Sequence, residues 1–531
     1  MILSSILSKI KEVLRKMIGT KTIENVLHIT PSISSDMINA IELWGAMYEN
    51  KAPWLKEPTE EDPSCVKSLG LPQFIASEKA RTALLEFKSD ITGVNSIRAD
   101  FLNNQYSKVK KQLRRQLEYG IAKGGLVIKP YVVINNSNSP LNNKKLDKFT
   151  MEFDYVQADD FYPLAFNGNG DLTEAAFIQR KIDKGTVYTR VEYHKFENRS
   201  VIVKNLAFKA SNSQSVSSKF DTGLGTPIAL IDVPEWANLQ EEVVIENVDR
   251  LMFAYFRMPE ANTIDTYSPL GVSGFDKAIG LIEDADNQYS RLLWEFEGGE
   301  LAIDVDRDAL KDEPIRDSNG NIIHHSTLGT LQQRLYRRVD LGNDSTYNVF
   351  SPQLRDVSLI NGLNNILMRI EDVTGLSRGT ISDASTSVEK TATELKILKQ
   401  RSYQTNHSIQ TSLQDTLDDL IYVMDVYCDL YNITPKGEYE VSYEWDDSIL
   451  VDVDTELHTR LELFDRKIIS DVEMRMWYLG ETEEQAIEAL SKVEQTEDTT
   501  ENTTNQEELN NKAEEIEEIT EENVQNEQKT E

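Results

Sequence analysis

Closely spaced carboxylates are the first feature of this chain that could support chemistry, because such groups bind metal ions. The run DVDRD at 304–308 alternates Asp with other residues, as a calcium-binding loop does. However, its sixth position is Ala309 and its twelfth is Ile315, where such a loop needs Gly and a bidentate Glu. We therefore interpret 304–308 as an acidic strand close to a turn.

Motifs for nucleotide, dinucleotide and metal chemistry are missing from the sequence or incomplete. There is no GxxxxGK(S/T) phosphate loop, and DTGLGTP at 221–227 lacks the third glycine and the βαβ context of a dinucleotide site. His324 and His325 are adjacent, so a strand would point them to opposite faces. Cys65 and Cys428 lie far apart in sequence, which favours a reducing compartment over a disulfide or zinc site. We expect no catalytic residue, no cofactor and no metal, and hence no enzyme.

The charge of the chain is strongly acidic and unevenly distributed, with a formal net charge of -33 over 531 residues. From 492 to 531 there are 14 acidic and 3 basic residues, so the tail 494–531 is predicted to be disordered. From 98 to 148 the balance reverses, with 11 basic and 3 acidic residues. The overall excess of acid argues against a protein that holds nucleic acid tightly, but not against one through which nucleic acid passes.

Two predicted helices have faces whose binding partner the sequence does not decide. Residues 1–29 contain an amphipathic helix interrupted by lysines, which either docks on protein or lies on a membrane surface. No apolar run approaches the roughly 20 residues that a membrane-spanning helix needs, and we expect no membrane partner. The helix expected at 96–119 carries a basic cluster that is either a solvated face or a patch against an acidic subunit or DNA: Lys108, Lys110, Lys111, Arg114 and Arg115.

Hydrophobic periodicity and turn residues predict an α+β protein of about two to four domains. Helices are predicted at about 34–50, 73–91, 96–119, 273–297, 356–374, 391–431 and 454–493. An antiparallel β region is predicted at 120–235, and short strands are predicted at 301–305, 334–341, 347–350 and 439–445. Two helices therefore bracket a small β module, and a loop and a very long helix follow them.

The loop rich in Gly, Ser and Thr is GLSRGTISDAST at 375–386. It leads into SVEKTATELKILKQRSYQ at 387–404, a basic helix start within an acidic chain. Thr391 as N-cap and Glu394 three residues later fit a capping box. The capped helix should hold the base of the loop rigidly, while Gly375 and Gly379 leave its tip mobile.

Three segments make the chain similar to a known family: FAYFRMPEANTIDTYSPLGVSGFDKAI at 253–279, SRLLWEFEGGELAI at 290–303 and IEDVTGLSRGTISDASTSVEKTATELKILKQRSYQT at 370–405. They resemble portal proteins of tailed bacteriophages, or prophages, of Gram-positive bacteria. KTATEL after the loop is the most specific part, and YTRVEYH at 188–194 adds to it. The resemblance covers most of 30–490 and leaves the acidic tail out.

The resemblance implies a phage portal fold and a ring, typically of twelve subunits, at one capsid vertex, where double-stranded DNA is packaged and ejected. By similarity the chain would divide into a wing at 30–270, stem helices at 271–299 and 354–374, a clip at 300–353, a tunnel loop at 375–390, a long wing helix and strand at 391–453, and a crown at 454–493. Implied partners are further copies of the chain, viral DNA in transit, the terminase large subunit, a head–tail connector or adaptor, and the major capsid and scaffolding proteins. The implied locations are the virion and, during assembly, the host cytoplasm.

The same resemblance assigns residues to three surfaces. The tunnel-loop residues beside the DNA would be Arg378, Ser382, Asp383 and Lys390. The acidic face of the first stem helix, which repels phosphates and lets the duplex slide, would consist of Glu283, Asp284 and Asp286. The docking surface of the clip would include Arg334, Arg337 and Arg338.

The basic residues around the loop leave two interpretations open. Either Lys390, Lys396, Lys399 and Arg401 pair with acidic neighbours between subunits, or basic residues give the duplex transient contacts, a role that best suits Arg378 and Lys390. Two other classes of protein also stay open. A non-portal component of a phage tail or baseplate would lack the order of helix, β module, helix, loop and long helix. A nuclease with clustered carboxylates and Mg²⁺ would cleave DNA.

Overall fold

The computed structural model describes residues 33–55, 65–134, 149–210, 224–306, 314–316, 318–325, 335–339, 347–383, 392–445, 453–479, 482, 485–487 and 489–491. At 306, 314–316, 322–325, 336–339, 392–400 and 453–456 it describes the backbone only. The predicted N-terminal helix and the tail 494–531 therefore lie outside the described residues. The described residues form both helices and strands, which confirms the α+β class. It divides into two units, Met1–Asp446 and Asp447–Glu531, which we describe separately.

Three helices open the described chain: α3 (Ser35–Tyr48), α4 (Leu71–Ala83) and α5 (Ile97–Lys123). The Ser34 hydroxyl caps α3 by accepting a hydrogen bond from the Met37 amide, and the Ser96 hydroxyl caps α5 by accepting one from the Ala99 amide. The apolar stripe predicted for α5 is buried: Leu102, Tyr106, Val109, Leu113 and Leu117. No helix among the described residues is long and apolar enough to cross a membrane.

The helix predicted at 73–91 is wrong in its second half. α4 ends at Ala83, and Lys88–Thr92 forms strand β1, which pairs antiparallel with β16 (Glu440–Glu444). Ile91 of β1 is buried in the core. Because the partner strand is so distant in the sequence, local periodicity carries no sign of the pairing.

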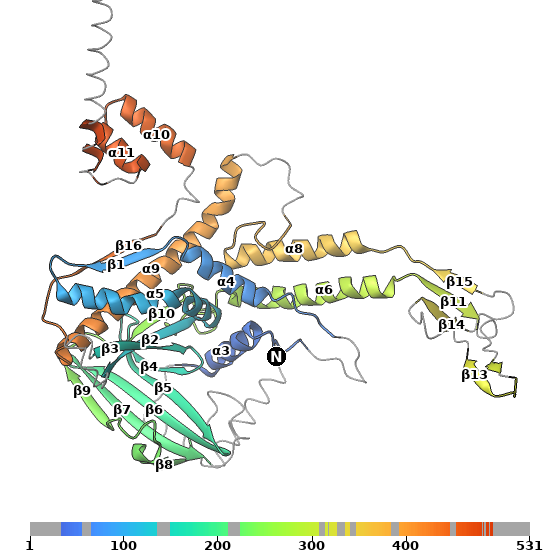
Figure 1. The fold of residues 1–531 in the computed structure, drawn as a ribbon, viewed down its shortest axis with the longest axis horizontal. Coiled ribbons are helices and arrows are strands. Elements are labelled where there is room, and N and C mark those ends of the chain that lie inside the picture. Colours follow the sequence, from blue (N-terminus) through green and yellow to red (C-terminus); the bar gives the residue numbers. More distant parts are fainter. Residues whose placement is uncertain are drawn as a thin grey trace, which may run out of the picture. The chain divides into compact units, whose positions relative to one another are not determined.

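The β region contains two antiparallel sheets (Figure 1). In the smaller, the strand order is β10-β2-β3, with β2 (Gly125–Ile134), β3 (Phe149–Gln157) and β10 (Ala254–Arg257). The larger sheet has the strand order β4-β5-β6-β7-β8, and β9 also pairs with β7. Its strands are β4 (Phe161–Phe166), β5 (Leu172–Asp183), β6 (Thr186–Glu197), β7 (Ser200–Ala210), β8 (Thr226–Ile228) and β9 (Glu242–Glu246). The hairpin turns Lys184–Gly185 and Asn198–Arg199 have positive φ at both residues, which matches the twist of their strands. These sheets confirm the antiparallel region predicted for 120–235.

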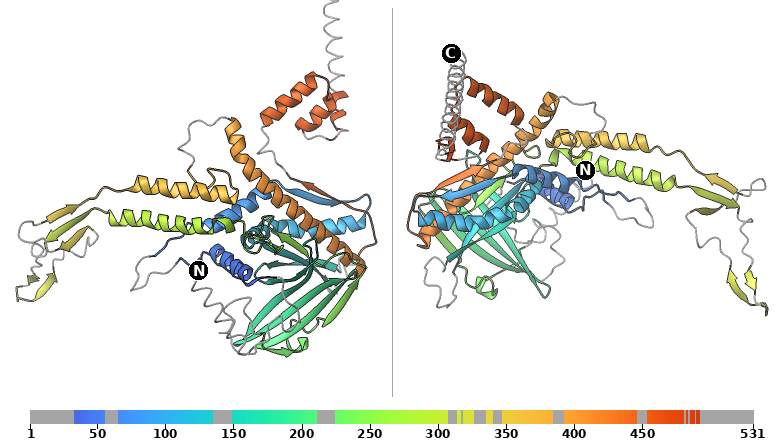
Figure 2. Two further views of the ribbon diagram at one scale, coloured as in Figure 1. Left: turned by 180° about the vertical axis from the view of Figure 1, so that it is seen from behind. Right: turned by 45° about the horizontal axis from the view of Figure 1, so that its top comes forward.

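Two helices bracket the β module, as predicted, and they lie side by side (Figures 1 and 2). α6 (Ile279–Gly298) follows the short 3-10 helix η4 (Asp276–Ala278) and so begins later than the predicted Ser273. The reason is that Gly274 belongs to a loop fixed to the core: its carbonyl accepts a hydrogen bond from the Lys79 ammonium at 2.8 Å, and its amide donates to the Ile121 carbonyl at 2.9 Å. α8 spans Asp356–Thr374, the predicted bounds.

The module between these helices is built on β11 (Ala302–Asp306). β11 runs parallel to β14 (Tyr336–Val339) and antiparallel to β15 (Tyr347–Phe350). β12 (Pro314–Arg316) and β13 (Ile322–His325) form a separate hairpin. Asp304 and Asp306 lie in β11, in agreement with the acidic strand inferred from the sequence.

The long helix is α9 (Ala392–Leu430), which packs on α4, β2 and β10. It begins directly after Thr391, whose capping role lies outside the described residues. In the second unit, the helical region predicted at 454–493 contains α10 (Val453–Asp465) and α11 (Asp471–Leu479). A capping box separates them, since the Glu473 amide donates to the Ser470 hydroxyl and the Ser470 amide donates to the Glu473 carboxylate.

The main core of the first unit gathers α3, α4, α5, β2, β10 and α9 around large buried side chains such as Trp44, Tyr106 and Phe256. The helix pair reaches this core mostly at one end, through Ile282 of α6 and Ile370 of α8. Most of the remaining length of both helices stands outside it. This arrangement places the loop that follows α8 next to the core and the β module at the opposite end of the pair.

Candidate functional site

The loop after α8 turns sharply because of Gly375. Its φ of +74° is left-handed, and a Cβ at this position would lie 2.4 Å from the Thr405 hydroxyl oxygen of α9. Glycine is therefore the residue that both the backbone and the close helix require. The Leu376 amide then donates to the Glu371 carbonyl at 3.0 Å, and the Leu376 side chain is buried. The loop is thus fixed where it leaves α8, at Gly375, a residue from which the sequence predicted mobility. The cap at Thr391 that was expected to fix the other side of the loop lies outside the described residues.

A buried carboxylate, that of Glu371 in the last turn of α8, organises the next part of the loop. Its Oε1 accepts hydrogen bonds from the amides of Ile381 at 2.6 Å and Ser382 at 2.8 Å. Its Oε2 accepts from the Ser382 hydroxyl at 2.7 Å and from the Gly379 amide at 3.3 Å. Glu371 is fully buried, so these charge-assisted bonds lie away from water. Both the amide and the hydroxyl of Ser382 therefore serve to hold the loop on Glu371.

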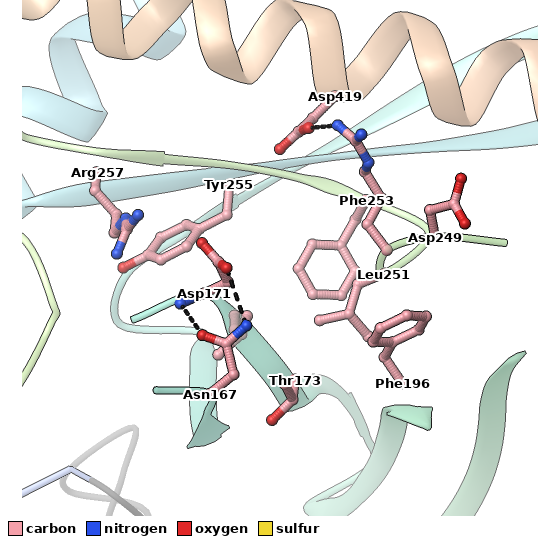
Figure 3. Close-up of a pocket in the computed structure, with 12 residues that line it drawn as sticks. Asn167, Asp171, Thr173, Phe196, Asp249, Leu251, Phe253, Tyr255, Arg257 and Asp419 are labelled. Carbon is pink, nitrogen blue, oxygen red and sulfur yellow. Dashed lines mark hydrogen bonds and ion pairs between the residues drawn. The ribbon is translucent and has the colours of Figure 1, made fainter. Parts of the chain in front are cut away.

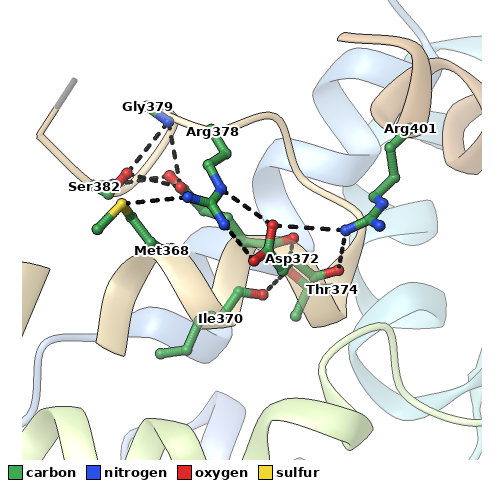
Figure 4. A network of polar contacts seen from close by, with 9 residues as sticks. Met368, Ile370, Asp372, Thr374, Arg378, Gly379, Ser382 and Arg401 are labelled. Atoms are coloured by element: carbon green, nitrogen blue, oxygen red, sulfur yellow. Dashed lines mark hydrogen bonds and ion pairs between the residues drawn. The ribbon is translucent and has the colours of Figure 1, made fainter. Parts of the chain in front are cut away.

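The neighbouring carboxylate, that of Asp372, lies between two arginines (Figure 4). Arg378 of the loop donates from Nε to Oδ1 at 3.2 Å and from Nη2 to Oδ2 at 2.6 Å. Arg401 of α9 donates from Nη1 to the Asp372 carbonyl at 3.1 Å and reaches Oδ1 at 3.6 Å. The hydrogen bond to Asp372 raises the pKa of Arg378 above its usual value. Both arginines thus pair with an acidic residue of their own chain. For Arg401, one interpretation of the sequence placed such a pair between subunits.

The loop then runs back along α8. The Asp383 amide donates to the Asn364 side-chain carbonyl at 2.7 Å, and the Asn364 side-chain amide returns a bond to the Asp383 carbonyl at 3.4 Å. Between Glu371 and Asn364 the helix rises by roughly 10 Å. The described part of the loop is therefore attached at two places, and the mobile tip expected from Gly379 does not begin before Asp383. Lys390 lies outside the described residues.

The acidic face predicted on α6 is only partly present. Glu283 and Asp284 are exposed, but Asp286 is 2% exposed. The Asp286 carboxylate accepts hydrogen bonds from Trp54 Nε1 at 2.9 Å and from the Leu69 amide at 2.8 Å, and burial raises its pKa. Asp286 of α6 therefore anchors the chain segment that precedes α4, and it is not part of an exposed acidic face.

At the other end of the helix pair, Glu295 of α6 and Arg355 before α8 form a two-pronged ion pair. Arg355 donates from Nε to Oε1 at 3.1 Å, from Nη2 to Oε2 at 2.6 Å, and from its amide to Oε1 at 3.0 Å. These bonds lower the pKa of Glu295 from 4.5 to about 2. Midway along, Gln288 of α6 donates to the Leu359 carbonyl of α8 at 3.4 Å. The contacts show that the two helices run antiparallel.

Large apolar side chains are exposed at this end of the helix pair and on the adjoining strands, which we call the apolar end of the pair. Its members are Trp294, Phe296, Leu301, Tyr347, Val349, Leu354, Val357 and Ile360. Exposed apolar patches of this kind mark interaction surfaces. Of the clip arginines predicted from the sequence, Arg337 and Arg338 stand opposite Asp304 and Val305 in the β14–β11 register, and Arg334 lies outside the described residues.

A pocket of about 370 Å³ lies between the larger sheet, β10 and α9 (Figure 3). Apolar side chains such as Phe196, Leu251 and Phe253 line it. Its charged groups serve packing, since Arg250 pairs with Asp419 of α9 and Arg257 donates to the Gly170 carbonyl at 3.0 Å. Over the described part of the chain, no group of three His, Cys, Asp or Glu residues is placed to hold a metal ion.

Sequence reasoning missed Glu371 and Asp372, which hold the predicted loop. A signal was available, because acidic residues are unfavourable in the last turn of a helix, where the dipole favours cations. α8 has two adjacent acids and no basic residue in that turn. Such a pair needs donors from elsewhere, and the loop and α9 supply them.

Comparison with known proteins adds one finding. The model of the family described as phage portal protein, SPP1 Gp6-like, matches residues 82–529. This range extends further into the acidic tail than the resemblance read from the sequence. No curated protein matches the chain.

Proposed function

Since this chain belongs to the family of phage portal proteins, we propose that α6 and α8 form the stem of a ring whose channel conducts double-stranded DNA. Portal proteins are structural proteins of the phage capsid, they self-associate, and the genome is packaged through them. The observation that carries the stem proposal is the antiparallel helix pair, joined to the core mostly at one end and ending in a β module at the other. At 1.5 Å per residue, each helix is roughly 30 Å long, enough to wall a channel.

The other parts of the ring follow from the stem. We place the clip at 300–353, where its exposed strands would dock first the terminase large subunit and later a head–tail connector or adaptor. The wing would comprise 30–270 and 391–453, and the crown 454–493. Interaction with the major capsid and scaffolding proteins, a ring of twelve subunits and assembly in the host cytoplasm are further parts of the proposal.

Charge supports the passage of DNA through the stem. Glu283 and Asp284 are exposed on α6, and an acidic wall repels phosphates and keeps the affinity for DNA low. In the tunnel loop at 375–390, Arg378 and Asp383 are the residues we propose beside the duplex. Ser382 would act from behind, by fixing the loop on Glu371.

Electron microscopy of the purified full chain tests the proposal. Class averages viewed along the axis should show a closed ring with a central opening wide enough for a DNA duplex. Difference maps after labelling of the β module should place it at one end of the channel. A protein that stays monomeric at high concentration, or a ring whose opening excludes a duplex, would contradict the proposed function.

A further inference from the structure

Arg378 binds Asp372 in the geometry that arginine also uses for phosphate. Two N–H groups of one guanidinium meet the two oxygens of one carboxylate, at 3.2 Å and 2.6 Å. A phosphodiester offers the same single negative charge and the same pair of oxygens. Of the Arg378 side chain 40% is exposed, so an incoming phosphate can reach it without opening the core.

The surroundings of this pair allow Arg378 to leave while the rest of the loop stays in place. The segment from Gly379 to Ser382 is bound to the buried Glu371 through three backbone amides and the Ser382 hydroxyl, and none of these four hydrogen bonds involves Arg378. In contrast, the Arg378–Asp372 pair is at the surface, where ion pairs contribute little to stability. Arg401 stays within reach of Asp372 and would keep its charge compensated after Arg378 has left.

We propose that Arg378 is a binding residue for DNA phosphates and that Asp372 is its resting partner, which the phosphate displaces. The proposal rests on the proposed function, because it needs the loop to face the channel. Its consequence is that each subunit makes only a brief contact. Permanently free arginines, repeated around a ring, would hold the duplex through many released counterions and stop it from sliding.

Salt-dependent DNA binding by assembled full-length rings tests this exchange, with a linear duplex of mixed sequence as the probe. Asp372→Asn releases Arg378, so affinity at low salt should rise, and the slope of log K against log salt should steepen by about 0.9 for each phosphate gained. Both effects should be absent from the double variant Asp372→Asn/Arg378→Gln. Arg378→Gln alone should flatten the wild-type slope, which keeps the test informative if Asp372→Asn does not assemble.

A matched control is Asp249→Asn, which removes the same charge and releases Arg199 from an exposed pair of 3.1 Å in the wing. It measures the effect of lost charge alone. Equal slopes for Asp372→Asn and Asp249→Asn, or a steeper slope that persists in the double variant, would overturn the role of Arg378. Such a result with intact, DNA-conducting rings would leave the proposed function standing, whereas a wild-type chain without rings would refute that function itself.

Discussion

Glu371 and Asp372 are neighbours of the same charge in one helical turn, yet they hold the loop in different ways. Glu371 is fully buried and bonded mainly to backbone amides, whereas Asp372 is at the surface and bonded to arginine side chains. Backbone amides fix the path of a chain, while side chains can exchange partners. We infer that Glu371 sets the position of the loop and Asp372 controls the charge that the loop presents.

Glu371→Ala tests the first of these roles. It removes the acceptor of the Ile381 and Ser382 amides and of the Ser382 hydroxyl, and one of the two acceptors of the Gly379 amide, which also reaches the Ser382 hydroxyl oxygen at 3.3 Å. Each buried donor left unpaired costs about 1–3 kcal/mol. We expect the amides of Gly379, Ile381 and Ser382 to lose their protection in hydrogen–deuterium exchange, while buried α9 around Leu417 keeps its own. Asn364→Ala is the matched control, since it removes only the attachment of Asp383. Retained protection at Gly379–Ser382 in Glu371→Ala would contradict this role.

The sequence located part of the site. Its Gly, Ser and Thr content marked 375–386 as a loop between two helices, and the resemblance to portal proteins then singled out Arg378 and Ser382. It could not show that Ser382 faces a buried carboxylate, nor that Asp286 is inside, because charge is visible in a sequence and burial is not. In the sequence, nothing distinguishes Asp286 from the other two acidic residues of α6, Glu283 and Asp284. What makes it different is that Trp54 and Leu69 pack over it and donate hydrogen bonds to its carboxylate.

At the scale of elements, sequence periodicity located the long helices well. α8 has its predicted bounds and α9 begins one residue after the predicted start. Helix ends are marked by local signals, as the end of α8 is by Gly375 with its φ of +74°. β1 escaped prediction, since a short strand gains its stability from a partner that is distant in the sequence. The start of α6 was missed for a similar reason: Lys79 and Ile121, far from Gly274 in sequence, hold its segment as a loop.

The helix pair should depend on pH through Glu295. Arg355 lowers the pKa of Glu295 from 4.5 to about 2, so the ionised form is bound more tightly in the folded chain than in the unfolded one. Its contribution to the free energy of unfolding is complete above pH 4.5 and is lost as the pH falls to about 2. The gap in denaturant midpoint between wild type and Glu295→Gln should therefore be constant above about pH 5 and shrink below it. Arg355→Gln should show the same pattern, and an equal gap at pH 3 and pH 7 would contradict it.

At the scale of the whole molecule, the apolar end of the pair is difficult to explain for an isolated chain. Trp294 is 67% exposed and Val357 is 65% exposed, and six more large apolar residues lie around them. Portal proteins self-associate, so a neighbouring subunit could cover this surface, because adjacent stems in a ring would lie beside each other. The apolar end would then be buried between subunits, and a charged side chain placed there would destabilise the interface.

Replacing these residues by aspartate tests that view of the ring. Burying a large apolar side chain contributes about 1.5–3 kcal/mol, and an unpaired charge in the same place is strongly unfavourable. We expect Trp294→Asp and Val357→Asp to prevent ring assembly in native mass spectrometry, with a circular-dichroism spectrum like that of wild type, since both positions are exposed in the single chain. The control is Ile182→Asp, because Ile182 in β5 is 68% exposed and should tolerate the charge. Rings of normal mass from Trp294→Asp and Val357→Asp would show that the stems do not meet through this surface. The clip or wing would then have to close the ring.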